Sequence, residues 1–102
     1  MESVGIWLKQ ARELRGLTLE DVAGQTKIRL HALVALEADD VQNLPAAVFV
    51  AGFVRQYALA VGLSADEAAL RYEEQRQAAA TEEMVAPRRR RGRSWLSRLI
   101  RG

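Results

Sequence analysis

The chain has 102 residues, 49% of them hydrophobic, so it is long enough for one small domain with a single core. It contains no cysteine, which excludes disulfides, thiolate chemistry and cysteine-based zinc sites. The net charge of +2 is unevenly divided, because residues 1–87 carry 8 Lys and Arg against 13 Asp and Glu, whereas residues 88–102 carry 7 Arg and no acidic residue. The basic character therefore belongs to the C-terminal tail.

Helical patterns begin at the N-terminus, and no segment alternates as a strand would. Ser3 is expected to cap a first helix that runs to about Arg15, and Gly16 is expected to end it in the left-handed conformation. The apolar positions of this helix are Ile6, Leu8, Ala11 and Leu14. In "TLEDVAG", Thr18 and Asp21 have the spacing of a capping box, which predicts a short second helix.

A third helix is predicted over about 27–38, with Thr26 as its N-cap. Its core positions are Ile28, Leu33 and Leu36. The following "ADDVQNLP" is predicted to be a loop, because Asp, Asn and Pro punctuate it. Pro45 suits the first turn of a fourth helix that runs to Val61, and Gly62 is expected to stop it.

Ser64 and Glu67 form a second capping-box match, which predicts a fifth helix that ends at about Gln77. The stretch "AAATEEMVAP" over 78–87 is predicted to be a linker between this helix and the arginine-rich tail.

The order of these elements resembles a known family. "ARELRGLTLEDVAGQTKI" resembles a bacterial helix-turn-helix domain, and the continuation "ALEADDVQNLPAAVFVAGFVRQYALAVGL" is similar to the cytoplasmic domain of the RodZ family. RodZ proteins link the actin-like filament protein MreB to the inner membrane of rod-shaped bacteria. The resemblance covers about residues 3–75 and implies an all-α, five-helix bundle of helix-turn-helix type over 1–77. It also implies that Phe49 and Phe53 contact the filament, with Arg55 and Tyr57 fitting the same pattern.

Two features depart from the family pattern. Ala51 stands where many relatives carry a basic residue, so a charge contribution at that position is not expected. RodZ proteins continue through a membrane helix, whereas the given sequence stops where such a helix is expected to begin.

The fourth-helix stretch "FVAGFVRQY" carries three aromatic residues four positions apart. At about 100° per residue they cover an arc of about 80°, with Tyr57 near the middle of the apolar face and Phe49 and Phe53 at its edge. Tyr57 is therefore predicted to be a core residue. From the residues alone, the two phenylalanines are either lids on the core or anchors for a partner. The family resemblance favours anchors, with Arg55 nearby.

A DNA reader is the competing prediction. A helix-turn-helix places its second helix in the major groove, and Lys27, Arg29 and His31 are the candidate contacts. The remaining exposed positions of that helix are predicted to be Leu30, Ala32, Val34 and Ala35, which offer few hydrogen bonds. The negative balance of residues 1–87 also opposes phosphate binding.

The tail "RRRRGRSWLSRLIR" is predicted to be membrane-proximal, with its arginines on an anionic surface and an apolar stripe at headgroup depth. A disordered basic tail and an arm on nucleic acid are the alternatives. The residues of the predicted membrane segment are Arg88, Arg89, Arg90, Arg91, Arg93, Trp95, Leu96, Leu99 and Ile100.

An enzyme is not expected. The sequence has no glycine-rich phosphate loop or nucleophile motif, one histidine, and acidic pairs that suit solubilising or capping roles. No cofactor or metal is predicted. The sequence therefore predicts a non-enzymatic adaptor in the cytoplasm, at the inner face of the membrane, with a DNA-binding regulator as the alternative.

Overall fold

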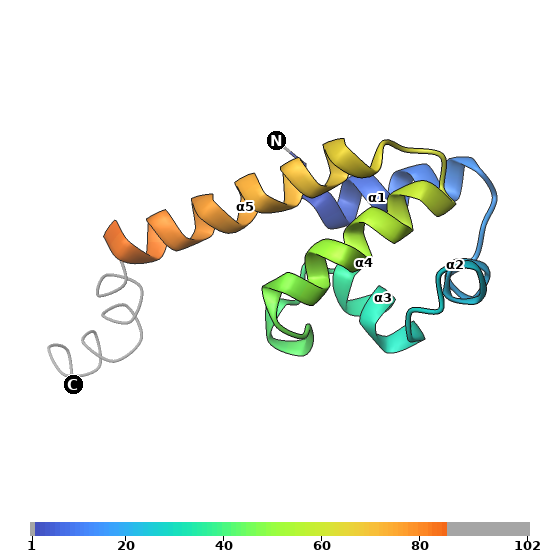
Figure 1. Ribbon diagram of the computed structural model, residues 1–102, viewed down its shortest axis with the longest axis horizontal. Helices are drawn as coiled ribbons and strands as arrows, with labels where there is room; N and C mark the ends of the chain where they lie inside the picture. Colours follow the sequence, from blue (N-terminus) through green and yellow to red (C-terminus); the bar gives the residue numbers. More distant parts are fainter. Residues whose placement is uncertain (1, 86–102) are drawn as a thin grey trace, which may run out of the picture.

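The computed structural model describes residues 2–85, and all regular structure within this range is helical (Figure 1). The prediction of an all-α bundle with five helices is therefore confirmed. The predicted membrane-proximal residues of the tail, 88–102, lie outside the described residues. The elements are α1 (Val4–Leu14), α2 (Leu19–Thr26), α3 (Leu30–Glu37), a short 3-10 helix η1 (Val41–Asn43), α4 (Ala47–Ala60) and α5 (Ala65–Val85).

Three helices begin as their capping residues predict. The Ser3 hydroxyl accepts a hydrogen bond from the backbone N–H of Ile6 at 3.1 Å. Thr18 and Asp21 form both hydrogen bonds of a capping box at the start of α2. Ser64 accepts from the backbone N–H of Glu67 at 3.1 Å. Each bond satisfies one of the backbone donors that a helix start leaves unpaired.

The prediction that Thr26 caps the third helix is wrong. Thr26 is the last residue of α2, and its hydroxyl donates to the carbonyl of Val22 at 2.7 Å while accepting from the N–H of Ile28. The hydroxyl therefore belongs to the last turn of α2, and the N–H that it accepts from lies before the first residue of α3. Lys27 then adopts a left-handed conformation with φ 64°, and α3 begins only at Leu30.

The fifth helix is longer than predicted. α5 continues to Val85 instead of ending near Gln77, so the stretch 78–85 that was expected to be a linker is helical. The reason is local, because this stretch contains three Ala and two Glu, which favour helix, and no Gly or Pro. Ion pairs Arg71–Glu67 and Arg76–Glu73 support the helix earlier in its length.

The core forms where α4 packs against α5 and α2, and where α1 and α2 meet α3 (Figure 1). In α1, the predicted apolar positions Ile6 and Leu14 are exposed, and Val4 and Gly5 are buried together with Leu8. Gly5 is required there because a Cβ would lie 2.4 Å from the carbonyl oxygen of Leu36. The largest fully buried side chains are Tyr57, Leu8, Leu33, Leu36, Val22, Val50 and Val54.

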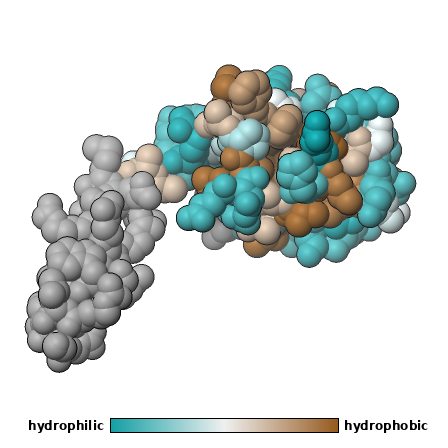
Figure 2. Space-filling model, turned by 90° about the horizontal axis from the view of Figure 1, so that it is seen from below, coloured by the Kyte–Doolittle hydropathy of each residue, from teal (hydrophilic) through white to brown (hydrophobic). Residues whose placement is uncertain are grey.

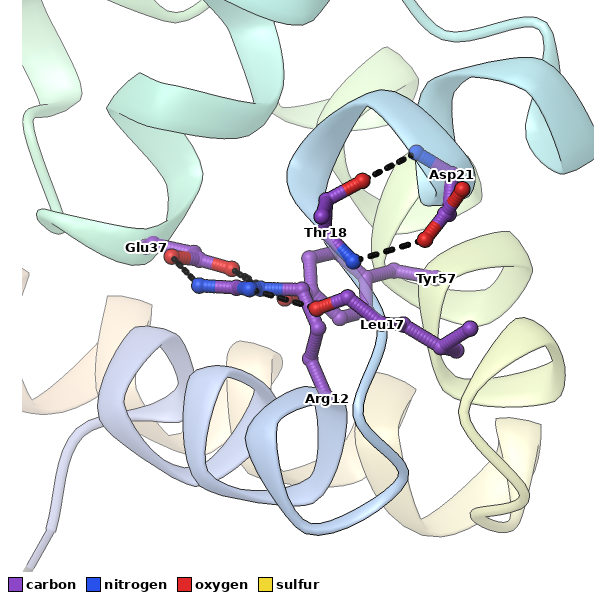
Figure 3. A network of polar contacts seen from close by, with 6 residues as sticks. All are labelled: Arg12, Leu17, Thr18, Asp21, Glu37 and Tyr57. Carbon is purple, nitrogen blue, oxygen red and sulfur yellow. Dashed lines mark hydrogen bonds and ion pairs between the residues drawn. The ribbon is translucent and has the colours of Figure 1, made fainter.

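A polar network ties three helices together inside the bundle (Figure 3). Arg12 of α1 donates from Nε and Nη2 to the two carboxylate oxygens of Glu37 at the end of α3, at 2.7 and 3.2 Å. Its Nη1 donates to the carbonyl of Leu17 at 2.8 Å. The hydroxyl of Tyr57 on α4 donates to Oε2 of Glu37. The hydrogen bond that Arg12 donates to Glu37 is the main reason why the pKa of Arg12 is raised.

Candidate protein-interaction surface

The three aromatic residues of α4 have different surroundings. Tyr57 is fully buried, with 0% of its surface exposed, which confirms its prediction as a core residue. Phe53 is partly buried and packs against the core cluster. Phe49 is 60% exposed, although it lies on the same helix. The first half of α4 therefore presents an aromatic ring to solvent from a backbone that its buried face holds in place.

Two further apolar side chains are exposed near the start of α4. Val48 precedes Phe49 in α4, and Val41 lies on η1, the short helix before it. Seen from below, the molecule shows apolar side chains at several places on the face formed by α3 and the start of α4 (Figure 2). Val48 was not predicted as a surface residue, although its helical phase indicates exposure, because it lies about 140° around α4 from the buried residues.

Arg55 points elsewhere. It forms an ion pair of 2.7 Å with Asp66 in the first turn of α5, and both side chains are solvent-exposed. Arg55 lies six positions after Phe49, which places the two side chains about 120° apart around the helix. The structure therefore brings Phe49 and Phe53 to neighbouring positions and turns Arg55 towards α5.

The predicted DNA-contacting residues lie around the start of α3. Lys27 is in the turn, Arg29 is the N-cap residue and His31 is in the first turn of the helix, and all three are exposed. Leu30 and Val34 are exposed as predicted, at 40% and 50%. The prediction that Ala32 and Ala35 are exposed is wrong, because both face the core beside Leu33 and Leu36.

The charges of α2 do not favour phosphate contacts. In a helix-turn-helix the first of the two helices crosses the DNA backbone. α2 contains no Lys or Arg, and its first turn carries the exposed residues Glu20 and Asp21. The hydrogen bond from the backbone of Thr18 lowers the pKa of Asp21, so this carboxylate is ionised at neutral pH.

Several other carboxylates in residues 2–85 have partners within the domain. Asp39 accepts from the hydroxyl of Ser3, the N–H of Gly5 and the amide of Gln75. The hydrogen bond from Arg76 lowers the pKa of Glu73. Within this range, no three His, Asp or Glu side chains are grouped as metal ligands would be. These arrangements support the bundle and do not form an acid–base pair.

Comparison with known proteins identifies the fold family. The family described as "Helix-turn-helix domain" matches residues 7–68, which is more than half of the chain. The chain belongs to this family. The match confirms the resemblance on which the sequence prediction rested, and the helix-turn-helix itself comprises α2, the turn at Lys27 and α3.

Two curated relatives are similar to this helix-turn-helix domain. The cytoskeleton protein RodZ of Streptococcus pneumoniae is 39% identical over 62 residues, which are 61% of this chain and 22% of that protein. The membrane protein YmfM of Bacillus subtilis is 41% identical over 51 residues, which are 50% of this chain and 18% of that protein. The chain thus matches only about a fifth of the length of these relatives.

A solved structure of YmfM from Staphylococcus aureus, described as a proposed DNA-binding membrane protein, has the same fold. It superposes with a TM-score of 0.66 at 30% sequence identity, and the match covers 72% of this chain and 89% of that one. In the part of the chain that the structure describes, every helix is too short or too polar to cross a bilayer.

Proposed function

We propose that this domain is a non-enzymatic adaptor that binds the actin-like filament protein MreB and holds it at the cytoplasmic face of the inner membrane. The observation that carries the proposal is the exposure of Phe49 on a helix whose next-but-one aromatic, Tyr57, is completely buried. The relationship to a cytoskeleton protein named RodZ supports the same partner class.

The first half of α4 has the properties of a docking anchor. Val50 and Val54 are buried, so the helix is fixed before any partner arrives, and little conformational freedom remains to be lost on binding. Burial of the exposed part of the Phe49 ring contributes about 1–2 kcal/mol, which corresponds to roughly 5- to 30-fold in affinity. Large aromatic side chains of this kind are common hot spots of interfaces.

The matched control is on the same helix. Leu59 is also 60% exposed, but it lies ten residues further along, about 15 Å from Phe49 along the axis. Phe49→Ala should weaken co-sedimentation with polymerised MreB at least fivefold, and Leu59→Ala should leave it unchanged. Phe53 also packs against the core, so Phe53→Leu, which keeps a large apolar side chain, is the suitable variant for testing filament binding at that position. Equal binding by Phe49→Ala and the unchanged chain, with both folded, contradicts the proposal.

The role of Arg55 is tested by moving its charge. Arg55→Glu removes both a positive charge from the surface and the ion pair with Asp66. Arg55→Glu combined with Asp66→Arg restores a pair of opposite charges, but position 55 still carries a negative charge in place of the positive one. If Arg55 contacts the filament, the double variant still binds more weakly than the unchanged chain. Full recovery in the double variant assigns Arg55 to the intramolecular pair alone.

The membrane half of the proposal rests on the sequence of the tail. Seven arginines and an apolar stripe favour an anionic surface, with about 1 kcal/mol from each Arg near the headgroups. Flotation with anionic and neutral vesicles at two salt concentrations tests this. Binding that is equal for both vesicle types removes the electrostatic part of the proposal.

DNA binding is the second candidate function, favoured by the exposed Lys27 and Arg29 and by the description of the YmfM structure. A binding titration with duplex DNA at several salt concentrations, set beside the co-sedimentation with MreB, distinguishes the two functions. Salt-sensitive DNA binding that is lost in Lys27→Glu with Arg29→Glu, together with no filament binding, replaces the adaptor with a DNA reader.

A further inference from the structure

α3 is apolar on both of its sides. Its inner side contributes Leu33 and Leu36 to the core. Its outer side carries Leu30, Val34 and Ala38, which are all exposed and stand four residues apart, so they lie along one stripe. A helix with apolar residues on both sides is normally covered on both sides. The outer stripe is therefore an apolar surface that lacks a covering element among residues 2–85.

The charges of α3 are placed against its own dipole. A helix favours acidic groups at its N-terminus and basic groups at its C-terminus. α3 has neither acidic residues in its first turn nor basic residues in its last turn. Arg29 and Lys27 stand at its N-terminal end, and its C-terminal end leads into Asp39 and Asp40.

The two carboxylates differ in how many contacts they make inside the domain. Asp39 is engaged by Ser3, Gly5 and Gln75 inside the domain. The contact of Asp40 in the described chain is with the exposed amide of Asn43, at 2.6 Å. Arg29 is exposed and its side chain does not cap its own helix. Arg29 and Asp40 thus lie next to the N-terminal and C-terminal ends of α3 and carry opposite charges.

We propose that the stripe Leu30–Val34–Ala38 is the contact between two copies of this chain, with the two α3 helices antiparallel about a twofold axis. An antiparallel copy presents its acidic C-terminal end to the basic N-terminal end of the first, and the reverse contact follows from the symmetry. The dipole of each α3 is then complemented by charges of the other copy, whereas the residues of its own helix do not complement it. This charge complementarity identifies a second copy as the occupant.

The spacing of the residues gives the register. With Val34 on the twofold axis, Leu30 of one copy faces the small Ala38 of the other, because each is four residues from the axis. Arg29 is the N-cap residue, one position before Leu30, and Asp40 follows Ala38 by two residues, after the left-handed Asp39 (φ 55°), so each lies close to one end of α3. The basic and acidic ends therefore meet twice in the same interface.

The size of the contact predicts a weak dimer. α3 has 8 residues and is therefore about 12 Å long, so an interface centred on it belongs to the small class, below roughly 1,200 Å² in total. The dimer is expected to form reversibly and only at high concentration. It also occupies the helix that a DNA reader would place in the major groove, so duplex DNA and a second copy would exclude each other.

The test is sedimentation velocity of the full 102-residue chain at low salt, from about 10 μM to about 1 mM, a range that brackets a weak association. The expected result is a concentration-dependent shift from monomer to dimer. Val34→Asp should raise the dissociation constant at least tenfold, because it places two like charges together on the axis. Leu70→Asp is the control, since Leu70 is exposed to a similar extent, 58%, but lies on α5.

Charge exchange tests the antiparallel register. Arg29→Glu should weaken the dimer several-fold while the melting temperature of the monomer stays equal or rises, because an acidic residue now stands at the N-terminus of α3. Asp40→Arg should weaken it similarly, and the double variant should recover most of the affinity. A single monomeric species at every concentration, a dimer that Val34→Asp leaves unchanged, or a double variant no better than the single ones would overturn the proposal.

Discussion

Tyr57 and Arg12 donate hydrogen bonds to the same oxygen of one carboxylate, Oε2 of Glu37 (Figure 3). Because Arg12 lies on α1, Glu37 on α3 and Tyr57 on α4, this one acceptor fixes the mutual positions of three helices. The side chains of Arg12 and Glu37 are almost completely buried, at 12% and 8% exposure. A buried pair of this kind is destabilising when one member is removed, because the other charge is left uncompensated.

Tyr57→Phe is expected to destabilise the fold by about 1–2 kcal/mol, because it removes a hydrogen bond to a charged group while the ring continues to fill the core. The measurement is the urea midpoint at neutral pH. Tyr72→Phe, on the partly buried tyrosine of α5, is the control and should change the midpoint much less. An unchanged urea midpoint in Tyr57→Phe would show that the Tyr57 hydroxyl does not stabilise the fold.

The contribution of Tyr57 should also depend on pH in the alkaline range. Burial, and then the hydrogen bond to Glu37, raise the pKa of Tyr57 above its ordinary value of 10.0. A raised pKa in the folded state contributes stability that is complete below pH 10.0 and is lost as the pH rises towards the folded pKa. The difference in stability between the unchanged chain and Tyr57→Phe should therefore narrow above that pH. A constant difference contradicts this linkage.

The contribution of Asp21 to stability depends on pH in the opposite direction. The hydrogen bond from the backbone N–H of Thr18 lowers its pKa below the ordinary value of 3.8. Its contribution is therefore present above that value and is lost as the pH falls through the folded pKa. Asp21→Asn should lower the melting temperature at neutral pH, and the deficit should vanish in strong acid. Glu20→Gln in the same turn, outside the capping box, is the control and should show a smaller deficit.

Two glycine substitutions should have opposite effects on stability. In Gly5→Ala the new Cβ would lie 2.4 Å from the carbonyl oxygen of Leu36 and 2.7 Å from that of Glu37, so α1 and α3 must separate. Overpacking of this kind costs about 1–3 kcal/mol. In Gly52→Ala no described atom outside the helix's own backbone lies within 4 Å, so the variant should gain up to about 1 kcal/mol from helix propensity. Urea denaturation of both variants measures the contrast.

Gly52→Ala also bears on the adaptor proposal. The empty space at Gly52 excludes close packing of another described helix as the reason for a glycine inside α4. Gly52 lies about 60° around the helix from Phe49, so a partner seated on Phe49 can approach the backbone there. The variant should therefore be more stable yet bind MreB more weakly. A more stable variant with unchanged filament binding places Gly52 outside the interface.

Most local features of the fold were predictable from sequence, apart from the role of Thr26 and the end of α5, whereas the features that depend on distant residues were not. Thr18 and Asp21 are three residues apart and form their capping box as expected. Thr26 was misassigned because its hydroxyl bonds within the preceding helix, an alternative that the same sequence permits. The buried role of Glu37 could not be predicted, since its partners Arg12 and Tyr57 are 25 and 20 residues away.

The same distinction holds for the candidate surface. Helical phase alone separated the buried Tyr57 from the edge position of Phe49. The direction of Arg55 depended on where α5 begins, because Asp66 in its first turn captures the guanidinium. The exposure of Ala32 and Ala35 was predicted wrongly, because α3 has apolar residues on both sides and its pattern does not indicate which side is buried.

The second half of α5 extends beyond the bundle (Figure 1). Gln75 is still bound to Val4 and Asp39, whereas residues 76–81 are all exposed. The segment 76–85 adds about 15 Å of helix, and each residue in it also turns the chain by about 100°. One residue inserted into this segment would therefore rotate the bundle, with Phe49, by more than a quarter turn relative to the C-terminal end of α5. Seven inserted residues would lengthen α5 by about 10 Å and leave this rotation almost unchanged. The length of α5 thus sets both the distance of the bundle from the end of the helix and its rotation about the helix axis, and insertions of different size change the two separately.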